Sequence, residues 1–309
     1  MNHNLIDWGK LYDFAKANTK EQFLTAVNKM IKIDELPLME RFITYMHKYE
    51  DMVLPKLLSN ANIQLTPQAF VQIVINEVRK NNKLLEAFAV NKESMFGSII
   101  AGAEIGLVPS ELHGEFFLIP RNIKQDDGKY LLTVTPLIGY KGLAKILLRS
   151  SEIETIDAQI VYQGDKFSVK YGSSPSISHT PKFEAARTAA NITHAYTVAH
   201  YKNGKKTFHV MTTAEITAVR DMSKTPNDLY FNDKKNPNRW MEKKACLIQM
   251  AKLMDKDLYT TKAIELDSRI ESGAIITIDD KNEIKLIEGA AIRPARFKSV
   301  YGTLDKLKD

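Results

Sequence analysis

Three cations lie four residues apart near the middle of the chain: Lys141, Lys145 and Arg149. On a helix this spacing places all three on one narrow stripe, and the apolar residues between them fall on the opposite side. Such a helix could bury one face and offer three positive charges to successive phosphates of a polyanion. An ordinary solvated helix face has the same spacing, so the pattern alone leaves both interpretations open.

Further cations gather around a predicted hairpin and the elements that follow it. Lys202, Lys205 and Lys206 surround the hairpin tip, where lysine also serves to discourage aggregation of strand edges. The other basic candidates lie on a capped helix, in the loop after it and on a late helix: Arg220, Lys224, Arg239, Lys243 and Lys244. Together with the stripe, these residues form the predicted binding site for a polyanion.

Aromatic residues are interleaved with these cations. They are Tyr140, Tyr201, Phe208, Tyr230, Phe231 and Trp240. Rings that stack on bases, next to cations that neutralise phosphates, suit single-stranded nucleic acid. Most aromatic residues of a domain are core residues, so packing is the competing interpretation for each ring. Of the six, Tyr140 is included in the predicted site.

Candidate catalytic groups form no pattern typical of an enzyme. No two of the seven histidines stand in a His-x-x-x-His pair, and Cys246 is the one thiol, so a zinc site lacks ligands. No phosphate-binding loop of the Walker type is present, which disfavours an ATP-driven recombinase or helicase. Adjacent carboxylates at 126–127 and 279–280 leave a metal-dependent DNA-processing enzyme open. We therefore predict no catalytic residues, no metal ligands and no cofactor, and leave a magnesium requirement undecided.

The charge distribution supports a polyanion partner. The 309 residues carry a formal net charge of +6. Residues 1–60 hold eight basic and eight acidic side chains and residues 256–309 hold ten of each, so the excess lies within residues 61–255. The chain has no run of eighteen apolar residues, no signal-peptide pattern and a single cysteine. We expect a cytoplasmic protein without a membrane partner.

Hydrophobic periodicity predicts an α+β fold. Helical spacing covers residues 5–60, and further helices are expected from Pro67, over 92–105, up to Arg149, from Thr212 and over 239–254. Strand-like runs cover 116–119, 130–134, 153–171 with a break at 163–165, 192–201 and 207–211. Asn203-Gly204 predicts a two-residue turn between the last two runs. The expected architecture is a small antiparallel sheet with hairpins, flanked by helices, with a helical N-terminal region.

Several short segments follow one another between residues 60 and 255. They are AEIGLVP from Ala103, GEFFLIP from Gly114, LIGYKG from Leu137, YQGDKF from Tyr162, HTP from His179, RDMSK from Arg220 and WMEKK from Trp240. This ordered series resembles the RecT family of phage recombinases. The family pattern places basic residues at Lys141, Arg149, Arg220, Lys224, Lys243 and Lys244, which the spacing also singles out.

The resemblance implies a protein that binds single-stranded DNA and anneals complementary strands without ATP. It implies assembly into an oligomeric ring or helical filament, with the annealed duplex as product and a phage exonuclease as partner. A host single-strand binding protein is a further candidate partner. A passive single-strand coating protein and a metal-dependent DNA-processing enzyme remain the alternatives from other classes.

The resemblance also suggests how the chain is divided. Residues 1–60 are expected to make subunit contacts, residues 61–255 to form the DNA-binding annealing core, and residues 256–309 to be a partly flexible tail for partner binding. One departure concerns the late helix, where the family has a small hydroxyl residue and an arginine pair after the two lysines. Here the run Ala245–Gln249 is mainly apolar, which predicts a smaller share of DNA contact for this helix.

Overall fold

A computed structural model of the chain describes residues 36–61, 65–124, 128–149, 152–222, 229–254, 257–271, 273–278 and 283–287. The predicted site residue Lys224, residues 1–35 and residues 288–309 lie outside this part. The helices are α3 (Leu38–Met52), α4 (Leu54–Asn60), α5 (Pro67–Lys80), α6 (Asn82–Val90), α7 (Lys92–Glu104), α8 (Tyr140–Leu147), α9 (Thr213–Asp221), α10 (Trp240–Leu253) and α11 (Leu258–Glu271), with a 3-10 turn at Ala189–Asn191. The strands are β1 (Phe116–Lys124), β2 (Tyr130–Ile138), β3 (Ile153–Tyr162), β4 (Lys166–Lys170), β5 (Ser176–Thr180), β6 (Ile192–Tyr201), β7 (Lys206–Thr212), β8 (Ile275–Ile278) and β9 (Ile284–Ile287).

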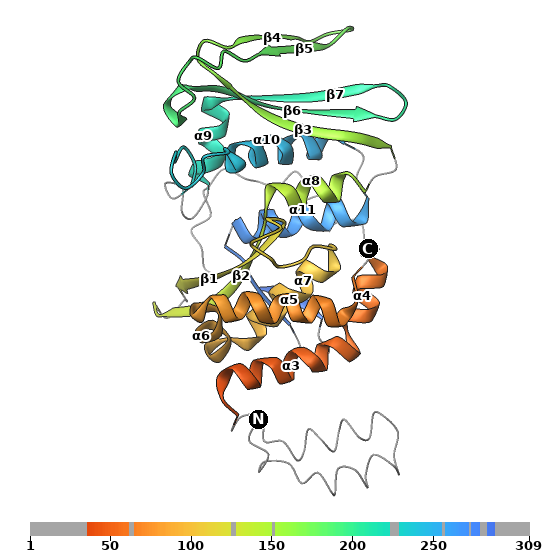
Figure 1. The fold of residues 1–309 in the computed structure, drawn as a ribbon, viewed down its shortest axis with the longest axis vertical. Coiled ribbons are helices and arrows are strands. Elements are labelled where there is room, and N and C mark those ends of the chain that lie inside the picture. Colours follow the sequence, from red (N-terminus) through yellow and green to blue (C-terminus); the bar gives the residue numbers. More distant parts are fainter. Residues whose placement is uncertain are drawn as a thin grey trace, which may run out of the picture.

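Two lobes are stacked along the long axis of the molecule (Figure 1). The helical lobe contains α3 to α7 with the β1–β2 and β8–β9 hairpins. The β-rich lobe contains an antiparallel sheet in the order β3–β6–β7, with the β4–β5 hairpin over one face and α9 and α10 on the other side. The predicted α+β fold, with antiparallel hairpins flanked by helices, is confirmed.

Helix α7 lies at the centre of the helical lobe. The Ser98 hydroxyl donates a hydrogen bond to the carbonyl of Val134 in β2, and the Val134 amide donates to the Ser94 hydroxyl, both at 3.0 Å. Gly97 lets β8 approach, because a Cβ atom there would lie 3.0 Å from the backbone of Thr277. Since strands contact α7 on more than one side, small and apolar residues line most of its length.

The described N-terminal helices pack into this same core. Phe42 of α3 meets Phe88 of α6 at 5.3 Å and Phe96 of α7 at 6.2 Å between ring centroids. Ala263 of α11 and Ile276 of β8 belong to the same buried cluster. The sequence of residues 256–309 lacks a strong period and gave no reason to expect regular structure, whereas α11, β8 and β9 form there. The core therefore continues beyond both predicted ends of the middle region.

The β6–β7 hairpin forms where the sequence predicts it, but its turn differs. The Gly204 amide donates to the Tyr201 carbonyl, and the Tyr201 amide donates to the Lys205 carbonyl, both at 2.9 Å. Gly204 has a φ of +79°, and Asn203 is not among the residues with positive φ. A two-residue type I′ turn needs positive φ at both central residues. The predicted two-residue turn was therefore wrong, and a three-residue loop ending in a left-handed glycine takes its place.

Helix α10 lies between the two lobes and contacts both. Cys246 packs under the β3–β6–β7 sheet, with its Sγ 3.5 Å from the carbonyl oxygen of Ala195. Leu247, the next residue, belongs to the buried cluster of the helical lobe. A helix that is buried on two sides has no single apolar stripe. Because α10 is packed on both sides, its first turn is held next to α8, and Figure 1 shows the two helices side by side.

Candidate nucleic-acid interface

Two aromatic rings and two lysines meet where the first turns of α8 and α10 come together. Tyr140 and Trp240 stack with ring centroids 5.2 Å apart and an interplanar angle of 28°. The Lys141 ammonium lies 5.9 Å from the Trp240 ring centroid, and the Lys243 ammonium lies 5.4 Å from it. Trp240 remains 37% exposed. We call these four residues the aromatic–lysine cluster.

Two glycines set the position of the α8 half of the cluster. A Cβ atom on Gly139 would lie 2.3 Å from the Gly114 carbonyl oxygen, and one on Gly142 would lie 2.1 Å from the Glu115 carbonyl oxygen. The Gly139 amide also donates to the Glu115 carbonyl at 2.9 Å. Only glycine allows this close approach of two backbones. The segment around Tyr140 and Lys141 is thereby held against residues 114–115.

A buried polar network sets the α10 half. Glu242 is fully buried and accepts hydrogen bonds from the Phe231 amide at 2.9 Å and from the Asn236 side chain. The Asn236 side-chain oxygen accepts from the Trp240 amide at 2.6 Å, so it satisfies a free amide at the start of the helix. Arg239, the residue before the helix, has a φ of +57°. This left-handed residue turns the chain sharply into Trp240.

Burial changes the titration of two cluster residues. Desolvation raises the pKa of Tyr140, and the nearby Asp157 carboxylate raises it further, against a smaller lowering by the Ala158 backbone. Desolvation lowers the pKa of Lys243, and Asp157 opposes this change. A partly desolvated ammonium on an aromatic face interacts more strongly with an arriving phosphate than a fully hydrated one does. The cluster is therefore suited to a ligand that carries both a planar ring and a negative charge.

The predicted basic stripe is only partly present, because its three cations have different surroundings. Lys141 is exposed within the aromatic–lysine cluster. Lys145 is exposed too, but its ammonium pairs with both carboxylate oxygens of Glu115, at 2.9 and 2.7 Å. Arg149 lies beyond the end of α8 and donates to the carbonyls of Ile105, at 2.7 Å, and Gly106. Arg149 thus caps the end of α7, which corrects its assignment to a free stripe.

Two cations of the late helix are buried. The Lys244 ammonium pairs with the Asp267 carboxylate at 2.6 Å and joins α10 to α11. Arg239 is 3% exposed and pairs with Asp233. Neither side chain can reach a DNA backbone in this structure. The structure therefore places Arg239 and Lys244 in the protein interior, whereas the sequence predicts them at the DNA-binding surface.

The remaining predicted cations are exposed or half-buried at some distance along the chain from the cluster. Lys202, Lys205 and Lys206 are exposed around the β6–β7 turn. Arg220 is half-buried at the end of α9, where it pairs with Asp221 at 2.6 Å and lies 5.6 Å from the Phe231 ring. Of the predicted site residues, the structure thus brings Tyr140, Lys141 and Lys243 together around Trp240.

Comparison with known proteins decides the family. The model of the RecT family matches residues 68–281, which is more than half of the chain. The chain belongs to the RecT family. It is similar to Protein RecT of Escherichia coli (strain K12), with 29% identity over 208 residues, covering 66% of this chain and 72% of the E. coli protein. Membership supports a function in DNA recombination by single-strand annealing, and with it binding of single-stranded DNA.

The AEIGLVP segment, which resembles the RecT family, has a structural role here. Gly106 in AEIGLVP has a φ of +74°, and the amides of Gly106 and Leu107 donate to the carbonyls of Ala103 and Gly102. This pattern is a Schellman C-cap, and it turns the carbonyls of Ile105 and Gly106 toward Arg149. The segment therefore fixes the end of α7 next to α8.

Asp165 in the YQGDKF segment fixes the base of the β4–β5 hairpin. Its buried carboxylate accepts from the amides of Tyr162 and Lys182, from the His179 ring at 3.0 Å and from Arg187 at 3.1 Å. Burial alone would raise the pKa of Asp165, but these hydrogen bonds and the Arg187 charge lower it to about 2. His179 belongs to the HTP segment, so both segments act through one clamp.

Sequence reasoning named Trp240 among the interleaved rings but did not place it in the site. The residues next to Trp240 in the sequence do not indicate its stacking partner, because Tyr140 lies 100 positions away. Across the part of the chain that the structure describes, no helix is long and apolar enough to cross a membrane. Within the same residues, no group of three or more His, Cys, Asp or Glu is placed to hold a metal ion.

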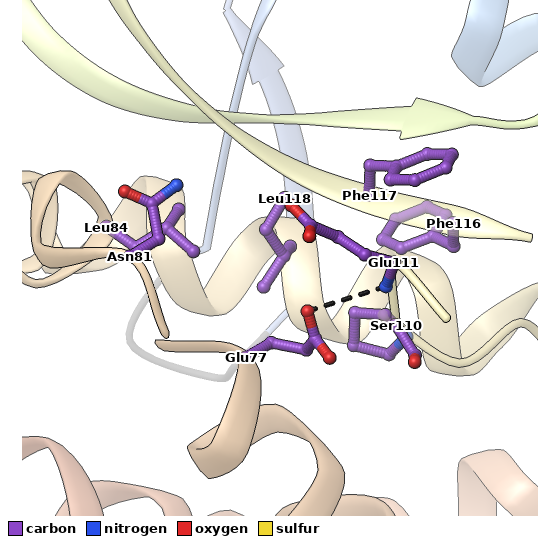
Figure 2. A pocket seen from close by; sticks show the side chains of 9 residues that line it. Glu77, Asn81, Leu84, Ser110, Glu111, Phe116, Phe117 and Leu118 are labelled. Atoms are coloured by element: carbon purple, nitrogen blue, oxygen red, sulfur yellow. Dashed lines mark hydrogen bonds between the residues drawn. The ribbon is translucent and has the colours of Figure 1, made fainter. Parts of the chain in front are cut away.

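Figure 2 shows a small pocket in the helical lobe, lined by residues of α5, α6, the segment before β1 and β1 itself. Its volume is about 20 Å³, and two carboxylates border it, those of Glu77 and Glu111. The Glu77 carboxylate accepts from the Glu111 amide at 3.4 Å and pairs with Lys80. A pocket of this size and charge does not suit a nucleotide, so it does not compete with the aromatic–lysine cluster.

Proposed function

We infer that the chain binds single-stranded DNA and anneals complementary strands without ATP, in phage-type homologous recombination. The aromatic–lysine cluster is the observation that supports this most. A partly exposed Trp240 ring offers a face for a base, and the ammonium groups of Lys141 and Lys243, 5.9 and 5.4 Å from the ring centroid, would neutralise the phosphates next to that base. Such contacts read no base edges, so the edges stay available for pairing with a second strand.

Annealing requires reduced repulsion between two polyanions and makes no covalent bond. Lysines that neutralise phosphates release counterions and provide this reduction. Each subunit offers few exposed cations near the cluster, so tight binding requires several subunits along one strand. We therefore propose that the protein acts as an oligomeric ring or helical filament, with single-stranded DNA as ligand and the annealed duplex as product.

The proposal extends to partners and cofactors. A phage exonuclease would supply the single strand, and a host single-strand binding protein would occupy it before this chain does. No cofactor is needed for a reaction that makes no bond, and magnesium would act only by screening phosphate charge. Annealing in EDTA at a matched ionic strength would therefore proceed at the rate measured with magnesium.

The experiment that tests the function is an annealing assay with two complementary oligonucleotides, one carrying a donor dye and one an acceptor dye. We expect wild-type protein to accelerate pairing equally with and without ATP, and to form complexes much larger than one subunit by mass photometry. Protection of the strands with slower pairing would show a passive coating protein instead. Shortened oligonucleotides that require magnesium would show a nuclease. Either result would overturn the proposal.

A further inference from the structure

The β4–β5 hairpin covers one face of the β3–β6–β7 sheet and uses its inward side chains to do so (Figure 1). Phe167 of β4 stacks on Tyr196 of β6 with centroids 5.6 Å apart. At the other end of the hairpin, Tyr171 meets Phe208 of β7 at 5.7 Å. The Asp165 clamp holds the base of the hairpin. The hairpin is therefore anchored at both ends and presents its second face to solvent.

The outward face of this hairpin has an unusual composition. Every outward residue of both strands is exposed, and every inward one is half-buried. The outward residues, in paired order, are Lys166 with Thr180, Ser168 with Ser178, and Lys170 with Ser176. The face thus carries two lysines and four hydroxyls and no carboxylate. We call it the hydroxyl–lysine face.

The spacing along this face suits an extended polyanion. Four residues of strand place Lys166 and Lys170 roughly 13 Å apart, with a pair of serine hydroxyls midway between them. Lysines and hydroxyls are the side chains that contact phosphate oxygens without reading sequence. Exposed aromatic rings lie near both ends of the hairpin, Tyr171 at 65% and Phe183 at 76% exposure. An acidic peptide would present carboxylates to the same lysines and hydroxyls, and binding to polyglutamate tests that alternative.

The face lies on the opposite side of the sheet from α10. Tyr196 of β6 points toward the hairpin, whereas Ala195 lies against Cys246 of α10. A sheet with a layer on each face separates the two sides by roughly 20 Å, since each packed layer adds about 10 Å. That exceeds the Debye length of about 10 Å at 0.1 M salt. Two strands bound at the two sites would therefore repel each other only weakly.

We propose that the hydroxyl–lysine face is a second, weaker binding site for the phosphate backbone of a DNA strand. The proposal rests on the proposed function, in which the aromatic–lysine cluster holds the first strand. A strand captured on the far side of the sheet is tethered close to the first strand, which raises its effective concentration for pairing. Because the site relies on point charges and hydroxyls, its affinity depends strongly on salt.

The test is a titration of full-length protein with a dT oligonucleotide at several salt concentrations. Wild-type protein should bind in two phases, of which the weaker is lost first as salt rises. The variant Lys166→Ala/Lys170→Ala should bind less tightly in the weaker phase and keep the tighter phase unchanged. Removing two phosphate contacts lowers the slope of log K against log salt by about 1.4 for a single strand. The advantage of wild type in the weaker phase should then shrink about sevenfold between 50 and 200 mM salt.

Two further variants serve as controls. Lys48→Ala/Lys83→Ala removes the same charge from exposed positions of α3 and α6, and it should keep both phases. Trp240→Ala should weaken the tighter phase and leave the weaker one unchanged. All substituted lysines are exposed, so the fold should survive each change.

Other outcomes of these measurements would contradict the second binding site. A weaker phase with wild-type affinity in Lys166→Ala/Lys170→Ala, or one that weakens equally in the lysine control, would overturn the second site. A single phase in wild type that depends on Trp240 would overturn it as well and leave the proposed function intact. Absence of any binding phase would remove both. If Lys166→Ala/Lys170→Ala loses binding to polyglutamate but keeps both DNA phases, the face belongs to an acidic protein partner and the proposal fails.

Discussion

Replacement of Trp240 by alanine isolates the stacking contribution of the aromatic–lysine cluster. Stacking of one base on an aromatic ring is worth about 1–3 kcal/mol. Because Tyr140 already stacks on the ring and only 37% of the residue is exposed, we expect the lower part of this range. A loss of about 1–2 kcal/mol corresponds to a roughly 5- to 30-fold weaker affinity for single-stranded DNA. The ring carries no charge, so the salt dependence should stay as in wild type.

The lysines of the cluster should show the opposite pattern. Lys141→Ala/Lys243→Ala removes two phosphate contacts and should lower the slope of log K against log salt by about 1.4. Fluorescence anisotropy with a labelled dT oligonucleotide over a salt series measures both affinity and slope. Tyr130→Ala is the matched control for Trp240→Ala, since Tyr130 is 68% exposed on β2 and lies outside the cluster. Circular dichroism and thermal unfolding establish that each variant is folded.

Two outcomes of these measurements would contradict base stacking on Trp240. A Trp240→Ala protein that binds within twofold of wild type would remove the ring from the interface. A Trp240→Ala protein with a clearly reduced salt slope would show that the ring acts by positioning Lys141 or Lys243 and that no base stacks on it. Trp240→Phe, which retains a smaller ring, should have an intermediate affinity with an unchanged slope if a base stacks there.

Three further predictions concern the groups that position the cluster. Arg149→Ala should lower the free energy of unfolding by about 1.5–3 kcal/mol in denaturant titrations, because two carbonyls at the end of α7 lose a charged donor, and DNA affinity per folded molecule should change little. Lys244→Ala leaves the Asp267 carboxylate buried without its partner and should cost about 3–5 kcal/mol, while Lys244→Met/Asp267→Leu should be clearly less destabilising by the same assay. The pKa of Asp165 is lowered from 3.8 to about 2. The ionised carboxylate therefore contributes about 2 kcal/mol to the free energy of unfolding above pH 3.8, and this contribution is lost as the pH falls toward 2. The difference in the free energy of unfolding between wild type and Asp165→Asn should narrow over that interval.

Features that depend on neighbouring residues could be predicted from the sequence. Thr66 caps α5 by accepting from the Ala69 amide, and the Thr212–Glu215 capping box opens α9. Gly106 ends α7 in the left-handed conformation that its place after the helix predicts. In each case the deciding contact lies within four residues, so the pattern contains all the information needed.

Whether a basic side chain pairs with a group inside the protein or stays available for DNA could not be predicted in this way. Helical spacing predicts the face on which a side chain lies only within the helix itself. Because α8 ends at Leu147, the spacing applies to Lys145 but not to Arg149. Lys244 pairs with Asp267 of α11, and the sequence of that helix shows no strong hydrophobic period. A basic side chain that pairs inside the protein and one that pairs with DNA have the same sequence signal. Three of the twelve predicted site residues were therefore assigned to DNA although their charges are used internally: Arg149, Arg239 and Lys244.

The departure from the family pattern in α10 falls on a helix that packs against both lobes. Within the run Ala245–Gln249, where the resemblance implies a hydroxyl residue and an arginine pair, Ala245, Cys246 and Leu247 are buried and Ile248 and Gln249 are half-buried. Cys246 lies under the β3–β6–β7 sheet and Leu247 lies in the helical lobe, so neither position faces solvent. An arginine introduced at Cys246 or Leu247 would therefore be a buried charge without a partner. Beyond its first turn, α10 joins the lobes, and Trp240 and Lys243 are its contribution to the proposed DNA interface.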